Sequence, residues 1–93
     1  MAIVNKVTGI EIVNIYPNPV RDIAILDIAS AKQDNVEVRV MDIAGKVLFT
    51  RKVAINSGST RVPLNLTNLS SGTYVVSIIA NGELIKSMKI IKD

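Results

Sequence analysis

The sequence predicts an all-β domain, a seven-stranded antiparallel immunoglobulin-like β-sandwich. Three observations lead to this prediction. Several segments alternate apolar and polar residues with a period of two, as half-buried strands do. Isoleucine and valine dominate a hydrophobic fraction of 48%, whereas aromatics make up 3%, and β-branched side chains favour strands. Turn signals separate the segments at short intervals, and a chain of 93 residues holds one small domain.

The first two strands are expected at residues 11–16 and 22–29. Between them the sequence reads Ile-Tyr-Pro-Asn-Pro-Val, residues 15–20. Pro17 and Pro19 each remove a backbone donor and fix one φ angle, so this segment cannot pair in the middle of a sheet. We interpret it as a rigid connection between two strands. Its fixed shape could equally serve a receptor that docks against it at low entropic cost.

A polar loop at residues 30–35 leads into a hairpin. Segment 36–42 alternates apolar and polar side chains, the period of a half-buried strand. The tetrapeptide Asp-Ile-Ala-Gly, residues 42–45, has aspartate first and glycine fourth, which favours a type I turn with a glycine bulge. Segment 46–54 is then expected to return as the partner strand.

Three more strands are expected at residues 60–66, 73–80 and 83–91. In the first of them Pro63 falls on the outward phase, which indicates an edge strand. The last two are joined by Asn-Gly at 81–82, the strongest short hairpin signal. The last strand does not alternate cleanly, which predicts either a bulge or a face partly open to solvent.

A further sandwich feature is predicted at the start of the sixth strand, in Leu-Ser-Ser-Gly-Thr-Tyr, residues 69–74. Immunoglobulin-like sandwiches often carry a tyrosine corner, in which a phenol hydroxyl bonds to the backbone a few residues upstream. We predict this role for Tyr74. The chain has no cysteine and no tryptophan, which excludes an antibody-type domain with its buried disulfide and tryptophan.

Composition also narrows the functional classes. Without cysteine and histidine, the chain lacks the usual ligands of zinc and copper, the commonest general base and the thiol nucleophile. The eight acidic residues have no calcium-loop spacing, so we predict no enzyme activity, no metal site and no cofactor. The net charge of +3 is spread along the chain, without the clustered cations of a nucleic-acid site. No apolar run reaches the ~20 residues of a membrane span.

Four segments together resemble a known family. They are Tyr-Pro-Asn-Pro-Val (16–20), Val-Arg-Val-Met-Asp-Ile-Ala-Gly-Lys-Val-Leu (38–48), the segment 64–78 with its Ser-Gly-Thr-Tyr, and a glycine turn with a lysine-bearing strand (82–92). Their order and spacing resemble the type A C-terminal sorting domain of type IX secretion, the Por secretion family. Such domains close proteins exported by certain Gram-negative bacteria.

The resemblance implies a secretion signal and not a catalyst. It implies that an attached cargo crosses the outer membrane by an outer-membrane type IX translocon with shuttle and sortase components. The domain is then removed, and the cargo is joined to an anionic lipopolysaccharide. The implied location is secreted or cell-surface, reached through the periplasm. The recognition residues carried over from the family are Pro17, Asn18, Pro19, Asp42, Gly45, Lys46, Gly72, Tyr74, Gly82, Lys86, Lys89 and Lys92.

A folding role is the alternative for all of these residues. The three glycines suit turns that need positive φ, and Asp42 suits the capping of a turn. The lysines of the last strand could protect a sheet edge from aggregation instead of being recognised. An exposed edge strand is also expected to allow weak self-association.

Residues 1–9 are expected to be a linker on the cargo side or a segment added for expression, and residues 10–93 the sorting domain. Cleavage is predicted at this boundary, because proteases need an extended, accessible chain. The predicted cleavage region comprises Val7, Thr8, Gly9, Ile10, Glu11 and Ile12.

One alternative function belongs to another class. A generic immunoglobulin-like adhesion module, or a carbohydrate-associated accessory module of an exoenzyme, would share the fold. An exposed pair of aromatic side chains would favour it, because sugar rings stack on aromatic faces. The chain has three candidates for such a pair: Tyr16, Phe49 and Tyr74.

Overall fold

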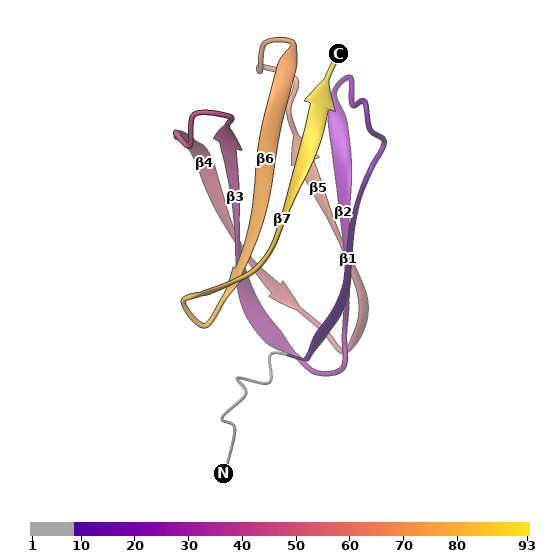
Figure 1. Ribbon diagram of the computed structural model, residues 1–93. Helices are drawn as coiled ribbons and strands as arrows, with labels where there is room; N and C mark the ends of the chain where they lie inside the picture. Colours follow the sequence, from indigo (N-terminus) through magenta and orange to yellow (C-terminus); the bar gives the residue numbers. More distant parts are fainter. Residues whose placement is uncertain (1–8) are drawn as a thin grey trace.

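Seven strands form two packed sheets in the computed structural model of the chain, which describes residues 9–93 (Figure 1). One sheet has the order β1-β2-β5 and the other the order β4-β3-β6-β7, with every neighbouring pair antiparallel. The strands are β1 (Ile10–Tyr16), β2 (Ile23–Ser30), β3 (Asp34–Asp42), β4 (Val47–Ile55), β5 (Gly58–Asn65), β6 (Gly72–Ala80) and β7 (Glu83–Lys92). The predicted all-β, immunoglobulin-like sandwich is confirmed.

The strand count needs one correction. Each predicted strand lies within two residues of an observed one at both ends. Val20, however, forms an isolated parallel bridge with Lys92, outside the seven strands. With this bridge the chain pairs through eight segments, where seven were predicted. The local sequence did not reveal it because a single paired residue after two prolines leaves no alternating pattern.

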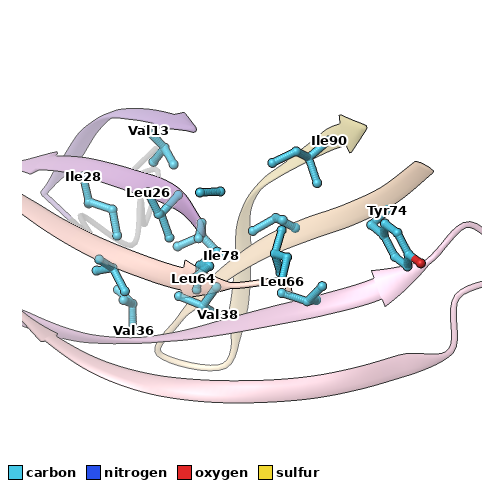
Figure 2. Packing of buried hydrophobic residues seen from close by; sticks show 14 of the residues in the cluster. Val13, Leu26, Ile28, Val36, Val38, Leu64, Leu66, Tyr74, Ile78 and Ile90 are labelled. Carbon is cyan, nitrogen blue, oxygen red and sulfur yellow. The ribbon is translucent and has the colours of Figure 1, made fainter. Parts of the chain in front are cut away.

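The core between the sheets is aliphatic apart from one tyrosine, as the composition predicted. In β2 the side chains of Ala24, Leu26 and Ile28 are buried, whereas the residues between them are partly exposed. Figure 2 shows Leu26 and Ile28, with Leu64 of the neighbouring strand β5, in the same core as Ile78 of β6 in the other sheet. The period of two therefore places one face of each strand in the core and leaves the other on the surface.

Strand β7 has both features that its irregular sequence pattern predicted. The register with β6 shifts so that Ile78 pairs with Lys86 but Ile79 pairs with Leu84, which leaves Ile85 as the extra residue of a bulge. As the outer strand of its sheet, β7 is also largely open to solvent, and within it Ile90 and Lys92 are the buried residues.

The two hairpin turns have the predicted conformations. Asn81 and Gly82 have φ angles of 54° and 74°, as a type I′ turn requires at both central positions. At the β3–β4 turn the amide of Gly45 donates to the carbonyl of Asp42 at 3.1 Å, and Gly45 has a φ of 92°. The pairing of β3 with β4 shifts after Val40, so this is the expected type I turn with a glycine bulge.

Because the strands alternate in direction, the connections gather at two ends of the sandwich. The β1–β2, β3–β4 and β5–β6 connections and the last residues of β7 lie at one end, which we call the distal end (Figure 1). The start of β1 and the other three connections lie at the opposite end, the proximal end. The chain therefore enters the domain at the proximal end.

Candidate functional site

Most of the predicted recognition residues lie at the distal end, although they come from four separate parts of the sequence. The β1–β2 connection, the β3–β4 turn, the start of β6 and the end of β7 each contribute. The residues gathered there are Pro17, Asn18, Pro19, Asp42, Gly45, Lys46, Gly72, Tyr74 and Lys92. Gly82 lies instead in the β6–β7 turn at the proximal end, and Lys86 and Lys89 lie between the two ends in β7.

The side-chain amide of Asn18 pairs with the backbone of β7. Its Oδ1 accepts a hydrogen bond from the amide of Ile91 at 2.9 Å, and its Nδ2 donates to the carbonyl of Lys89 at 3.4 Å. One amide group thus contacts alternate residues of the strand, as a neighbouring strand would. The distances indicate that the bond to Ile91 is the stronger of the two.

Val20 continues the same edge with its main chain. Its amide donates to the carbonyl of Ile91 at 2.7 Å, and its carbonyl accepts from the amide of Asp93 at 2.8 Å. The Val20 side chain is fully buried. Together, Asn18 and Val20 bind outer backbone groups of Lys89 and Ile91 in β7 and of Asp93 directly after it. The segment Pro-Asn-Pro-Val therefore closes the end of an edge strand that would otherwise be open.

The contact of Asn18 and Val20 with β7 gives the proline-containing segment a second structural role besides connecting β1 to β2. Both X–Pro peptide bonds, Tyr16-Pro17 and Asn18-Pro19, are cis. The interpretation of the segment as a connection was correct but incomplete, because it also covers β7. The sequence analysis did not identify Val20 as a partner of β7; the available signal was an apolar residue directly after the two prolines.

The aspartate of the β3–β4 turn uses its carboxylate to shape the turn. Asp42 Oδ1 accepts from the amides of Ala44 at 3.0 Å and Lys46 at 2.9 Å. A Cβ added to Gly45 would meet nothing within 4 Å, so its positive φ and not crowding favours glycine there. The turn leaves the Lys46 side chain exposed to solvent.

The predicted tyrosine corner is present. Tyr74 is buried at the distal end of the core, and its hydroxyl donates to the carbonyl of Ser70 at 2.6 Å (Figure 2). This bond ties the β5–β6 connection to β6. The sequence predicted the tyrosine and the upstream acceptor, but it did not identify Ser70.

We expect Tyr74→Phe to lower the free energy of unfolding by about 1 kcal/mol, because the Ser70 carbonyl loses its partner while the ring still fills the core. Urea unfolding followed by circular dichroism measures the change. Tyr16→Phe is the matched control, since Tyr16 is 41% exposed, and it should leave the midpoint unchanged. Equal effects of the two substitutions would show that the corner bond adds nothing.

Comparison with protein-family models shows the family to which the chain belongs. The model of the secretion system C-terminal sorting domain matches residues 14–93, which covers every strand from β2 to β7 and the last three residues of β1. The chain belongs to this family. It is thus a type IX secretion C-terminal sorting domain, whose family acts as an export signal and not as a catalyst. No curated protein matches the chain.

Family membership gives the coarse function of the sorting domain. It directs an attached cargo to the cell surface or into the medium, and it acts through the type IX secretion machinery. No helix among residues 9–93 has the length and apolar character needed to cross a membrane. The same residues hold no group of three or more acidic side chains that could bind a metal ion.

The three predicted lysines of β7 differ in their surroundings. The side chain of Lys89 is exposed, whereas the Lys86 ammonium donates to the carbonyl of Val13 in β1 at 3.3 Å. Lys92 is 8% exposed, and its ammonium donates to the main-chain oxygen of Asp93 at 3.1 Å. Of the three lysines, Lys92 is therefore the one that is buried, which does not suit protection of an exposed sheet edge. In the sorting domain, Lys86 links the two sheets and Lys92 packs at the distal end.

The opposite open side of the sandwich has a similar link. Arg51 of β4 donates through Nη1 to the carbonyl of Pro63 in β5 at 2.6 Å. Pro63 is exposed and lies in an outer strand, as its phase predicted. Lys86 thus joins β7 to β1, and Arg51 joins β4 to β5. Each side chain connects an outer strand of one sheet to an outer strand of the other.

The proximal end carries a depression of about 430 Å³ on the outer face of the four-stranded sheet. Its lining includes the ion pair of Arg39 and Glu37, together with Ile79 and Leu84. Of the predicted recognition residues, Gly82 alone contributes to this lining. The depression is therefore separate from the distal cluster of motif residues.

The described part of the predicted cleavage region, residues 9–12, lies at the proximal end. Val7 and Thr8 fall outside the described residues. The carbonyl of Gly9 accepts from the amide of Ala31 at 2.7 Å, and residues 10–12 belong to β1, with a register irregularity between Ile10 and Ile12. The later part of the region is thus already paired with β2.

Proposed function

We propose that the distal end is the surface by which the outer-membrane translocon and its shuttle and sortase components recognise this domain. The gathering of the family motifs carries the proposal. Segments around Pro17, Asp42, Tyr74 and Lys92 are far apart in the sequence but lie together at one end of the fold. If these residues served folding alone, each would be needed only in its own turn or strand. Folding would not require that all four motif segments lie at the same end of the sandwich.

The position of the cargo supports the same proposal. The cargo precedes the domain, so it would be attached where the chain enters, at the proximal end. The distal end is then the part of the domain farthest from the cargo, and a large cargo would leave it accessible. This separation suits a signal that must serve cargo proteins of any shape.

We further propose that the chain is cut within Val7 to Ile12, around the start of β1, and that the released cargo is attached to a lipopolysaccharide at the cell surface. Proteases act on extended, unpaired chain. Since Ile10 begins β1 and the Gly9 carbonyl is already bonded, we favour the part of this region that ends at Gly9. Residues 10–93 would then leave as the folded domain.

The exoenzyme-module alternative lacks the feature that would favour it. Of the three aromatic side chains, Tyr16 is exposed, Phe49 is partly buried and Tyr74 is buried. The described part of the chain therefore offers no exposed aromatic pair on which a sugar could stack. We retain export as the proposed function.

The proposal predicts export of a reporter cargo fused ahead of residues 1–93 and carrying a general export signal, in a bacterium that has type IX secretion. We expect the cargo outside the outer membrane, and mass spectrometry should place its new C-terminus within residues 7–12. The same cargo without the domain should remain in the periplasm. Retention of the complete fusion there would refute the export function, and a mature product that keeps residues 16–20 would refute the cleavage region.

A further inference from the structure

Large apolar side chains that remain exposed are concentrated at the distal end. Six such side chains are found among those whose exposure the structure describes, and five of them lie there: Tyr16, Ile23, Ile43, Val47 and Ile91. The sixth, Leu84, is next to the proximal turn. Single exposed apolar residues are ordinary, but a group of them within one region marks an interaction surface.

Strand pairing places part of this group in one continuous patch on the four-stranded sheet. Met41 of β3 pairs with Val47 of β4 on one side and with Val75 of β6 on the other. Val75 in turn pairs with Lys89 of β7, and Ile91 is the next outward residue of that strand. We call the side chains of Met41, Val47, Val75 and Ile91 the distal strip.

Alternation fixes the direction of the strip. Val40, Val76 and Ile90 are fully buried, so their neighbours Met41, Val75 and Ile91 face away from the core. Val47 and Ile91 are 46% and 48% exposed. The strip thus lies on the outer face of the sheet, where folding of the core gives no reason for apolar side chains.

The charges beside the strip are cationic at both sides. Lys46 precedes Val47 at the β3–β4 turn, and Lys89 closes the row on β7; both side chains are exposed. The nearest turn carboxylate, that of Asp42, is engaged by two backbone amides, and Asp93 lies beyond Ile91 at the tip of the strand. A complementary surface would have an apolar centre and carboxylates facing the two lysines.

We propose that the distal strip, flanked by Lys46 and Lys89, is the docking surface for a protein of the secretion machinery that presents an apolar face with acidic side chains at its rim. This inference rests on the proposed export function and specifies the surface through which it operates. The strip adjoins the edge closed by Asn18 and Val20, so the family's first, middle and last motifs border one interface. Tyr16 and Ile23, on the other sheet, lie outside it.

Paired substitutions on one sheet face test the strip. Val47→Thr with Ile91→Thr keeps β-branched side chains at exposed strand positions, so folding is expected to be preserved. We expect export of the fused reporter to fall about tenfold or more, as for apolar contacts at the centre of an interface. Leu84→Thr is the matched control: the same kind of change on the same sheet, outside the strip, with export unchanged. Equal export of the double variant and the wild type overturns the proposal.

A second pair of matched substitutions tests the cationic side chains beside the strip. Lys89→Gln removes a cation at the strip, whereas Lys52→Gln removes an outward cation of the same sheet near the proximal end. Export should fall for the first and stay at the wild-type level for the second. Equal effects would show that overall charge and not the strip is recognised.

A photo-crosslinking amino acid at position 47 identifies the occupant. The expected product joins the domain to a protein of the type IX machinery, and Ile91→Thr should weaken it. Products with lipid, or with a second copy of the domain, would overturn the proposed partner. The wild-type fusion separates two failures: if it is not exported, the proposed function fails, and if it is exported together with all strip variants, the strip inference alone fails.

Discussion

Asn18→Ala is expected to reduce export of an attached cargo about tenfold or more and to expose the Ile91 amide to hydrogen exchange. The side chain of Asn18 makes two hydrogen bonds to the backbone of β7, one to the Ile91 amide at 2.9 Å and one to the Lys89 carbonyl at 3.4 Å. Losing them costs about 1–2 kcal/mol locally and frees the edge of the strand between Lys89 and Ile91. Amide exchange measured by nuclear magnetic resonance reports the opening, and the reporter fusion reports export.

Two further variants define this prediction. Asn18→Asp keeps the oxygen acceptor for Ile91 but loses the donor to Lys89, so its effect should be intermediate. Asn68→Ala changes an exposed asparagine at the same end of the sandwich and should behave as the wild type. If the Ile91 amide exchanges freely in Asn18→Ala while export is normal, the edge closure described above has no role in recognition.

Ile78→Ala should abolish export although it changes none of the predicted recognition residues. Ile78 is fully buried in the middle of β6, and such truncations cost about 2–5 kcal/mol. That is a large share of the roughly 5–15 kcal/mol that stabilises a small domain. Unfolding would separate the four segments of the distal end, so a signal read as a folded surface would disappear.

The graded variant Ile78→Val should cost only about 0.5–1.5 kcal/mol and leave export close to the wild-type level. Urea unfolding gives the stability of both variants, and the reporter fusion gives their export. Normal export of a variant that is unfolded at the growth temperature would demonstrate that the machinery reads a linear sequence, and the distal-end proposal would then be wrong.

The sequence was most informative where structure is determined locally. Apolar patterning and turn signals together located every strand within two residues. The Asn-Gly pair and the Asp42 turn specified two hairpins because each turn type needs particular φ angles. The tyrosine corner was also predictable, since its hydroxyl reaches Ser70, four residues upstream. All of these features depend on residues that are close together in the chain.

Contacts between distant segments could not be predicted in the same way. Asn18 meets Ile91 across 73 positions, and no local pattern marks an asparagine as the partner of a particular strand edge. The lysines of β7 illustrate the same limit. Their spacing is regular, but a bulge at Ile85, the neighbouring β1 strand and Val20 give them different surroundings. Which motif residues the machinery contacts remains a prediction.

Closure of β7 by Asn18 and Val20 also has a consequence for biosynthesis. A ribosome makes the chain from its N-terminus, so the Pro-Asn-Pro segment emerges several seconds before the strand that it binds is translated. Until then, the side-chain amide of Asn18 cannot bind the β7 backbone. If the messenger RNA is broken, or the ribosome stalls, before β7 is translated, the product contains the cargo and the Pro-Asn-Pro segment. It lacks the distal end that forms only when this segment binds β7. Recognition of that surface would therefore restrict export to completely translated cargo, and stalled chains of graded length would reveal the residue at which export competence begins.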